Sequence, residues 1–251
     1  MALIVENLTF GYEGRPVLRD IFLQAPKGKF TVLLGKNGSG KSTLLKCMAG
    51  LMAAQKGRIM VFGRDLSRLS LSERAKLIGY LPQFHHPVFP FTVEEVVLTG
   101  RASYVFFTPG QKDKDKVGEA IKRVGLEAFR KRPYSELSGG ERQLVLIARL
   151  LAQEPKIVVL DEPLSHLDFP NQIKFLNLIK EFTLSDLTVI AVLHDLNSAF
   201  LHGDHFIFLK DGMIRKSGQE GNPWDSETLT DVYSTPIETV PFQERSLVIP
   251  R

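Results

Sequence analysis

One segment, Gly35–Thr43, restricts what this chain can fold into more than any other. It reads GKNGSGKST and fits G-x-x-x-x-G-K-[ST] at every required position. A short apolar run over Lys29–Leu34 precedes it, and a helical pattern over Ser42–Leu51 follows it. Strand, glycine-rich loop and helix in this order turn backbone N–H groups and the positive end of a helix dipole toward one point. The segment is therefore predicted to bind phosphate. The alternative, a glycine-rich turn that binds nothing, is disfavoured by both flanks.

The phosphate loop, our name for Gly35–Thr43, predicts a nucleotide site of defined chemistry. Its backbone N–H groups would hold phosphate oxygens, Lys41 would reach the β- and γ-phosphates, and the Ser42 hydroxyl is an oxygen ligand of the kind that Mg²⁺ prefers. The predicted ATP contacts in the loop are Gly35, Lys36, Asn37, Gly38, Ser39, Gly40, Lys41, Ser42 and Thr43. We expect the chain to bind and hydrolyse a nucleoside triphosphate, with ATP and Mg²⁺ as its cofactors.

A second segment supplies carboxylates. Ile157–Leu160 is a continuous apolar run, typical of a strand buried on both faces, and Asp161 and Glu162 follow it directly. Such a strand is expected to end at the sheet edge that carries the phosphate loop. Asp161 is predicted to hold Mg²⁺, through water, and Glu162 to polarise an attacking water as general base. Alone, this pair could be ordinary surface charge; beside a phosphate loop it predicts catalysis.

The composition is that of an ordinary globular protein. Of 251 residues, 43% are hydrophobic and 24% charged, enough for a normal core. The net charge of +4 indicates an anionic partner only weakly, and a nucleotide or membrane surface satisfies it as well as nucleic acid does. The single cysteine, Cys47, excludes an internal disulfide and is expected to be a small core residue. No segment is apolar enough to span a bilayer, and the first residues lack the pattern of a signal peptide. We expect a cytoplasmic chain.

The predicted fold is α/β: a P-loop NTPase (RecA-like) core with an N-terminal antiparallel β region and an inserted α-helical lobe. The expected strands are Ala2–Phe10, Val17–Ala25, Lys29–Leu34, Gly57–Phe62, Leu77–Pro82, Ile157–Leu160, Thr188–Leu193, and a hairpin of Phe206–Leu209 with Met213–Ser217. Capping boxes at Ser70/Glu73 and Thr92/Glu95 predict helix starts, and a further helix is expected over Gln172–Phe182. We expect one domain, with residues 1–83 and 155–251 forming the core and 84–154 the lobe. From Glu227 a short helix and an extended end are expected.

The segment Leu137–Gln143, LSGGERQ, discriminates among nucleotide-binding proteins. Ser138 and Glu141 form a capping box, so Ser138–Gly140 is predicted to be the first turn of a helix and a second place for phosphate. Two such places about a hundred positions apart could hold one nucleotide from opposite sides if two chains pack head to tail. A plain capped helix is the alternative. The predicted ATP contacts of this turn are Ser138, Gly139, Gly140 and Glu141.

LSGGE resembles the LSGGQ signature of the ABC (ATP-binding cassette) ATPases, and the resemblance covers nearly the whole chain. Gly35–Ser42 resembles the Walker A motif of that family and Ile157–Glu162 its Walker B motif. Glu141 replaces the usual glutamine, which keeps the capping box but adds a negative charge near a polyphosphate. We expect a penalty of about 1 kcal/mol or less in water-screened geometry, without loss of activity.

The resemblance implies roles for four further places in the chain. Gln83 matches the Q-loop glutamine, which contacts Mg²⁺ and transmits state to membrane subunits. Ser165 and Asp168, in the stretch SHLD, match the D-loop, which crosses to the partner's site. His194 matches the switch histidine at the γ-phosphate, and Tyr12 the aromatic residue that stacks on adenine. Singly, Gln83 could be a surface residue, His194 a strand-end histidine and Tyr12 a core residue; jointly, in family order, they favour the site.

Several stretches resemble one branch of the family, the importers of iron–siderophore complexes, haem and vitamin B12. These stretches are Val97–Arg101, Leu164–Asp168, His194–Ala199 and Leu229–Tyr233. The first also resembles zinc and manganese importers. The resemblance implies a homodimer of ATPase subunits, two integral membrane permease subunits and, indirectly, an extracytoplasmic substrate-binding protein. It implies a peripheral position on the cytoplasmic side of the inner membrane, and no nucleic acid is expected.

Other functions stay open at this point. Import of zinc, manganese or an oxyanion, a non-transport ABC ATPase acting on DNA or the ribosome, and a small-molecule kinase are the alternatives. The run Phe84–Phe91 contains two adjacent histidines, His85 and His86, that could suggest a metal site; we favour a loop that faces the membrane subunit. Tyr104–Phe107 has the same interpretation, with a place in the lobe core as its alternative.

Overall fold

A six-stranded sheet forms the centre of the chain. The computed structural model describes residues 1–251 except 84–89, 106, 166, 220–225, 243–244 and 251. The sheet has the strand order β10-β9-β3-β8-β7-β6. Its strands are β3 (Phe30–Leu34), β6 (Ile78–Leu81), β7 (Ile157–Asp161), β8 (Thr188–Val192), β9 (His205–Lys210) and β10 (Met213–Gln219). All neighbours pair in parallel except β10, which forms an antiparallel hairpin with β9. Every residue of β3, β7 and β8 is buried, which explains their continuous apolar runs.

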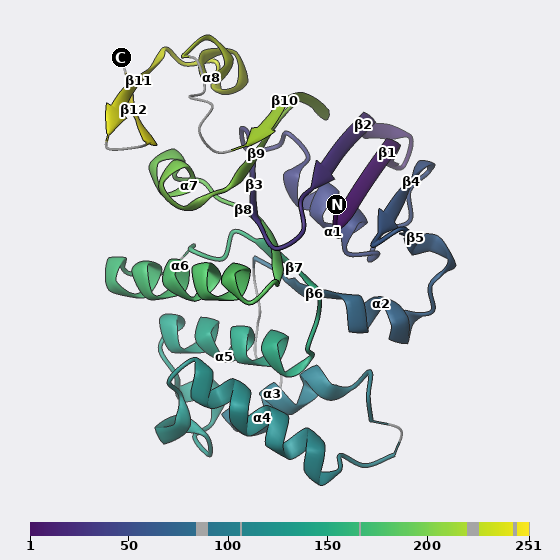
Figure 1. The fold of residues 1–251 in the computed structure, drawn as a ribbon, viewed down its shortest axis with the longest axis vertical. Coiled ribbons are helices and arrows are strands. Elements are labelled where there is room, and N and C mark those ends of the chain that lie inside the picture. Colours follow the sequence, from purple (N-terminus) through teal and green to yellow (C-terminus); the bar gives the residue numbers. More distant parts are fainter. Residues whose placement is uncertain (84–89, 106, 166, 220–225, 243–244, 251) are drawn as a thin grey trace.

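An antiparallel sheet lies over one face of this centre (Figure 1). Its order is β2-β1-β4-β5. The strands are β1 (Leu3–Tyr12), β2 (Arg15–Ala25), β4 (Lys56–Val61) and β5 (Arg64–Asp65). The helix α1 (Lys41–Met48) contributes Leu44, Leu45 and Cys47 to the apolar cluster between the two sheets. The expectation of Cys47 as a core residue is confirmed: it is fully buried, and this burial raises the pKa of its thiol to about 11.

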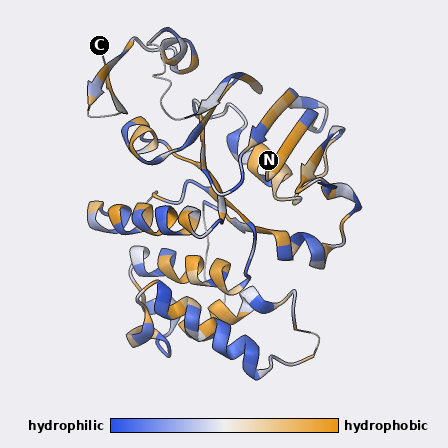
Figure 2. Ribbon diagram, in the orientation of Figure 1, coloured by the Kyte–Doolittle hydropathy of each residue, from blue (hydrophilic) through white to orange (hydrophobic). Residues whose placement is uncertain are grey.

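The stretch between β6 and β7 is mainly helical among its described residues. Its helices are α3 (Val93–Leu98), α4 (Gln111–Arg123) and α5 (Gly139–Ala152), with short 3₁₀ turns at Thr99–Arg101, Glu127–Phe129 and Tyr134–Glu136. The α/β part also contains α2 (Leu71–Leu77), α6 (Phe169–Leu184) and a 3₁₀ turn at Leu66–Arg68. The capping boxes predicted at Ser70, Thr92 and Ser138 are all confirmed. Apolar side chains on α5 join the cluster on the second face of the central sheet, whereas α4 is largely polar (Figure 2).

The chain after β10 adds α8 (Ser226–Tyr233) and a β-hairpin. The hairpin strands, β11 (Ile237–Phe242) and β12 (Arg245–Pro250), pair antiparallel, and β12 packs on α7 (Leu196–His202). The expected short helix and extended end are confirmed, and the two extended segments pair with each other, which the sequence did not predict. The α/β fold class with its antiparallel region and helical lobe is confirmed.

Two predicted helix bounds are wrong, and both errors have a local cause. The helix expected over Ser42–Leu51 ends at Met48, with Ala49 as its C-cap and Gly50 at a positive φ of 71°. The helix expected from Gln172 begins at Phe169, because Asp168 caps it and a proline fits its first turn. Residues 84–89 of the aromatic run, with His85 and His86, lie outside the described residues, as do Phe106 and His166.

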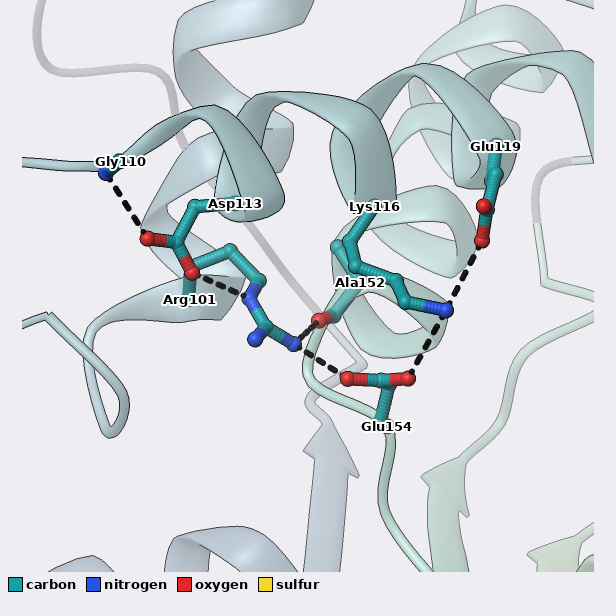
Figure 3. A network of polar contacts seen from close by, with 7 residues as sticks. All are labelled: Arg101, Gly110, Asp113, Lys116, Glu119, Ala152 and Glu154. Carbon is teal, nitrogen blue, oxygen red and sulfur yellow. Dashed lines mark hydrogen bonds and ion pairs between the residues drawn. The ribbon is translucent and has the colours of Figure 1, made fainter.

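Arg101 forms a buried ionic network in the helical part (Figure 3). Its side chain is 2% exposed, and its guanidinium donates to Asp113 at 3.0 Å, Glu154 at 2.8 Å and the Ala152 carbonyl at 2.7 Å. The Tyr104 ring lies 3.9 Å from the guanidinium carbon. Arg101, the last residue of the family-like stretch Val97–Arg101, thus joins α4 to the end of α5. Among the helices that the structure describes, none is long and apolar enough to cross a membrane.

Candidate functional site

The predicted site residues gather where the parallel strands end. The phosphate loop follows β3, Gln83 lies two residues beyond β6, Asp161 is the last residue of β7, and His194 lies two residues beyond β8. These strands pair in parallel and in register, with Asp161 opposite Val192. Their carboxyl ends therefore meet at one edge, where open α/β sheets bind ligands.

A cavity of about 460 Å³ opens at this edge. The residues that line it are Val17, Asn37, Gly38, Gly40, Lys41, Ser42, Thr43, Gln83, Glu162 and His194. Gly38 and Gly40 hold φ angles of +80° and +103°, which residues with a Cβ rarely adopt. The first N–H groups of α1 have no partner within their helix and face this end of the loop. The cavity thus combines backbone donors with one lysine, which is the chemistry that polyphosphate requires.

The phosphate loop also carries an unsatisfied polar group. Ser39 is 5% exposed, and its buried hydroxyl has no hydrogen-bond partner among the described residues. Lys41, also 5% exposed, donates from Nζ to the carbonyl oxygens of Gly35 at 2.7 Å and Lys36 at 2.8 Å. Burial lowers the pKa of Lys41, while the carboxylates of Glu162 and Asp161 oppose this effect. A phosphate at the loop would give both side chains an anionic partner.

Asp161 is held by hydroxyl groups. Ser42 donates to one carboxylate oxygen at 3.0 Å, and Tyr80 donates to the other at 3.4 Å. Burial raises the pKa of Asp161, the Ser42 bond opposes this, and the nearby Glu162 adds to it. Tyr80 was not among the site residues predicted from the sequence. The signal that could have found it is its place on β6 opposite Val159, two residues before Asp161 on the neighbouring strand.

The oxygens of Ser42 and Asp161 suit a Mg²⁺ ion. Both are hard ligands, and they lie next to the phosphate loop. Within the described part of the chain, no group of three or more His, Cys, Asp or Glu side chains could hold a metal. Mg²⁺ in nucleotide sites takes few protein ligands and fills its remaining positions with phosphate oxygens and water. The residues present therefore fit the ion that ATP chemistry requires.

Glu162 is the point where the predicted site residues converge. Its backbone has a φ of +52°, uncommon for a residue with a Cβ, and its side chain is 11% exposed. Gln83 donates to it from Nε2, and the Ser165 hydroxyl lies 3.3 Å from the same oxygen. The Nε2 of His194 lies 2.6 Å from the other carboxylate oxygen. Two segments far apart in sequence, together with a serine only three residues after Glu162, thus hold this carboxylate at the cavity.

The signature turn, Ser138–Gly140 with Glu141, begins α5 away from this cavity. None of its residues is among the described residues that line the cavity. The Ser138 hydroxyl accepts from the Glu141 N–H at 3.3 Å, and the Glu141 carboxylate accepts from the Ser138 N–H at 2.7 Å. This second bond lowers the pKa of Glu141. A Cβ on Gly140 would lie 2.6 Å from the side-chain nitrogen of Asn171, so the Asn171 side chain would have to shift to admit alanine.

A hydrogen bond joins α5, the helix that the signature turn begins, to the segment after β7 that carries Glu162. Gln143, on α5, donates from its side chain to the Pro163 carbonyl at 3.0 Å, one residue beyond Glu162. The sequence analysis placed Gln143 only within the family motif. Asp168 caps α6 by accepting from the Asn171 N–H at 3.2 Å, and the side chain of Asn171 lies against Gly140 of the signature turn.

Tyr12 lies outside the cavity lining. It ends β1, is 43% exposed, and packs edge-on against Phe10. Its hydroxyl lies 3.5 Å from the Thr43 hydroxyl and 3.3 Å from the Met52 sulfur. The ring is therefore accessible beside the phosphate loop. Its predicted stacking on adenine stays a prediction.

Comparison with known proteins identifies relatives over the whole length. The family model described as ABC transporter matches residues 18–165. A probable iron chelatin transport ATP-binding protein of Helicobacter pylori is 36% identical over 253 residues, covering 99% of both chains. A hemin import ATP-binding protein of Streptomyces coelicolor is 38% identical over 239 residues, covering 94% of this chain and 85% of that one.

Solved structures give the same result. A putative metal-chelate type ABC transporter in an inward-facing conformation matches with a TM-score of 0.86 and 32% identity, covering 100% of this chain and 97% of that one. A dimeric ATP-binding cassette in a post-hydrolysis state, bound to ADP and Pi, matches with a TM-score of 0.77 and 28% identity, covering 86% and 98%. Fold and sequence thus agree on a single family of nucleotide-binding proteins.

Proposed function

The chain belongs to the ABC transporter family as an ATP-binding subunit with ATPase activity, and from this premise we propose that it powers import of a metal chelate. The observation that carries the catalytic part is the convergence of Gln83, Ser165 and His194 on Glu162 beside the phosphate loop. The names of the relatives, which include iron chelatin and hemin transport, support the substrate class.

Hydrolysis begins with the phosphates of ATP in the phosphate loop. Backbone N–H groups of the loop and the Lys41 ammonium hold the β- and γ-phosphates. Glu162 accepts a hydrogen bond from the attacking water and polarises it toward the γ-phosphorus. His194, in contact with Glu162, donates to the γ-phosphoryl oxygens as negative charge develops there. Ser42 and Asp161, with Gln83 lining the same cavity, would hold Mg²⁺, and the ion would neutralise charge on the phosphate oxygens.

A complete site takes a second copy of the chain. The signature turn of one copy, with Ser138, Gly139, Gly140 and Glu141, closes over the ATP bound to the phosphate loop of the other. Two observations support this arrangement: the turn lies outside its own cavity, and a similar cassette has been solved as a dimer. Ser165 and Asp168 lie between the two places, since one contacts Glu162 and the other caps α6 beside Gly140.

The nucleotide base extends from the cavity toward Tyr12. The accessible ring of Tyr12 beside Thr43 supports stacking on adenine.

We also propose that residues 1–83 and 155–251 move as the core and 84–154 as the lobe when the two copies close. The signature turn would then travel with the lobe and the phosphate loop with the core.

The two ATPase copies act on two integral membrane permease subunits at the cytoplasmic side of the inner membrane. An extracytoplasmic binding protein delivers the substrate to them. The absence of a spanning helix among the described residues is compatible with a peripheral subunit, and similarity to a metal-chelate type transporter supports this assembly. Gln83, on the loop after β6 and bonded to Glu162, links that loop to the site.

Reconstitution tests this function. The chain is placed in vesicles with its membrane pair, and phosphate release is measured with binding protein loaded with ferric siderophore, haem or cobalamin. One of these chelates is expected to stimulate hydrolysis and to accumulate inside, and the Glu162→Gln variant should abolish both effects. Stimulation by free zinc, manganese or an oxyanion instead would contradict the substrate class. Failure to associate with any membrane protein would contradict the transport function.

A further inference from the structure

Tyr233, the last residue of α8, reaches the first residue of the phosphate loop. The Gly35 N–H donates a hydrogen bond to the Tyr233 hydroxyl at 3.2 Å. Gly35 is buried with a φ of +152°, and a Cβ there would lie 2.1 Å from the Leu209 carbonyl oxygen on β9. The backbone is therefore pressed against β9, and its N–H cannot turn toward solvent without moving the loop. The Tyr233 hydroxyl fixes the point at which the phosphate loop leaves β3.

The side chain of Tyr233 is suited to this neutral contact. Burial raises the pKa of its hydroxyl to about 12, although the bond from Gly35 opposes the shift. The group is therefore uncharged throughout the neutral pH range and adds no negative charge beside bound phosphates. The helix α8 is tied to the end of β9 by the ion pair of Lys210 with Asp231 at 2.6 Å. Leu229 and Val232, both fully buried in the core, hold α8 beside the start of the phosphate loop, and the exposed ion pair adds little to this packing.

Asn197 makes a second link from the C-terminal part of the chain to the site. Its side-chain amide donates to the Val248 carbonyl at 3.2 Å and accepts from the Val248 N–H at 2.7 Å. One side chain thus satisfies both backbone groups of a residue in β12, as a neighbouring strand would. Val248 is 9% exposed, so water has little access to replace these hydrogen bonds if the Asn197 amide is removed. The contact fixes α7 against β12.

The position of α7 determines where His194 can lie. The helix begins at Leu196, two residues after His194, and Asp195 caps it by accepting from the Ser198 N–H at 2.7 Å. A link this short cannot absorb a displacement of the helix. A shift of α7 on β12 would therefore change the 2.6 Å contact of His194 with Glu162.

We propose that α8 and β12 position the ATP-hydrolysing site, with Tyr233 holding the phosphate loop and Asn197 holding the loop of His194. This inference rests on the roles proposed above for the phosphate loop and His194. It assigns the C-terminal part of the chain to catalysis, through contacts that touch neither ATP nor the reacting atoms. The two contacts act on different steps, because the phosphate loop binds ATP and His194 acts on the γ-phosphoryl group.

The first test is Tyr233→Phe in the full chain. The ring and its packing remain, and only the acceptor for the Gly35 N–H is lost. MgATP binding, measured by displacement of a fluorescent trinitrophenyl-ATP, is expected to weaken about 3- to 10-fold, since one net hydrogen bond is lost. The rate constant kcat for phosphate release at saturating MgATP should stay within about twofold of the unchanged chain. The matched control is Asp231→Asn, which loses an exposed ion pair of the same helix and should leave both constants unchanged.

The second test is Asn197→Leu, which keeps the approximate shape and removes both hydrogen bonds. Here kcat is expected to fall about 10-fold while MgATP binding stays within about twofold, the reverse of the first variant. Asn197→Asp keeps the acceptor for the Val248 N–H and should restore part of the lost kcat. Thermal unfolding of each variant, measured in parallel, shows the folded fraction.

The outcomes separate this inference from the proposed function. Lys41→Ala and His194→Ala are measured in the same series. If these two variants fail as expected while Tyr233→Phe and Asn197→Leu leave binding and kcat unchanged, or change them only in proportion to the folded fraction, the positioning role is overturned. If Lys41→Ala and His194→Ala themselves behave as the unchanged chain, the proposed site is overturned instead. The positioning role is supported if Tyr233→Phe weakens MgATP binding with little change in kcat and Asn197→Leu lowers kcat with little change in binding.

Discussion

The Nε2 of His194 lies 2.6 Å from Oε1 of Glu162 and joins the loop after β8 to the loop after β7. The imidazole is 44% exposed at the cavity, whereas the carboxylate is 11% exposed. A bound γ-phosphate and its attacking water would therefore meet both groups at once. The proposed mechanism depends on this pair, because it assigns Glu162 to the attacking water and His194 to the phosphoryl oxygens.

Replacement of His194 tests this pair. His194→Ala is expected to retain MgATP binding within about threefold and to lose about 100-fold or more of the hydrolysis rate, since a donor to developing charge is removed. Phosphate release and trinitrophenyl-ATP fluorescence measure the two quantities. The matched control, His202→Gln, changes an exposed histidine at the other end of α7. Hydrolysis by His194→Ala at the rate of this control would exclude His194 from the reaction.

Lys41 is expected to control binding itself. Lys41→Ala removes the charge that would pair with the β- and γ-phosphates, and the loss of such charge-assisted bonds predicts about 10- to 100-fold weaker MgATP binding. Equilibrium dialysis with labelled ATP measures the dissociation constant. Lys29→Ala, an exposed lysine just before β3, serves as control. Equal affinity of the two variants would remove the phosphate loop from the site.

Glu141 in the signature turn gives a prediction about charge. The Ser138 N–H keeps the pKa of this carboxyl below its usual range, so the group is charged at neutral pH in the turn that we propose meets the partner's ATP. Glu141→Gln preserves an acceptor oxygen and removes the charge. ATP-driven dimerisation should be as strong or up to about fivefold stronger, with a difference that shrinks at high salt. Analytical ultracentrifugation at two salt concentrations measures it, with the exposed Glu136→Gln as control. Weaker dimerisation would show that the carboxylate contributes to the site.

The Arg101 network predicts a loss of stability with a defined pH dependence. Arg101→Met leaves Asp113 and Glu154 without their buried partner and should lower the free energy of unfolding by roughly 1.5–3 kcal/mol at pH 7. The bond from Arg101 lowers the pKa of Asp113; for Glu154, burial raises the pKa, but the bonds from Arg101 and Lys116 outweigh it. A lowered pKa contributes stability above the ordinary values of 3.8 and 4.5, and this contribution is lost as pH falls through the folded-state values.

Urea unfolding measured from pH 7 to pH 3 checks this prediction. The difference between Arg101→Met and the unchanged chain should be largest at neutral pH and shrink in acid. Lys116→Met, at the more exposed side of the same network, should cost about 1 kcal/mol or less. A difference that grows toward acid would contradict the ionic origin of the stabilisation.

Much of the fold follows from local patterns in the sequence. The buried parallel strands appear as continuous apolar runs, and the three capping boxes each need only residues three positions apart. The phosphate loop and Asp161 were equally visible, because a glycine pattern and a strand-end carboxylate are short-range signals. Their meeting at one edge follows from the parallel order of the sheet.

Contacts between distant residues could not be predicted in this way. Tyr80 bonds to Asp161 and Tyr233 to Gly35 across 81 and 198 positions, and no periodicity connects such pairs. The C-terminal hairpin was likewise missed, because its pairing and its anchor at Asn197 depend on how α7 packs. Arg101 looked like part of a family motif, and only its burial shows that it joins helices. These residues share one property: their partners are fixed by tertiary packing.

In the proposed mechanism, one ATP is held between the phosphate loop of one copy and the signature turn of another. The most direct measurement is the mass in solution of Glu162→Gln, by light scattering after gel filtration, with and without MgATP. This variant should bind ATP and hydrolyse it too slowly to reopen. A chain of 28.2 kDa that doubles its mass only when MgATP is present, and returns to monomer when Ser138→Arg blocks the signature turn, is the predicted result. A variant that binds ATP fully and remains at 28.2 kDa would contradict the account.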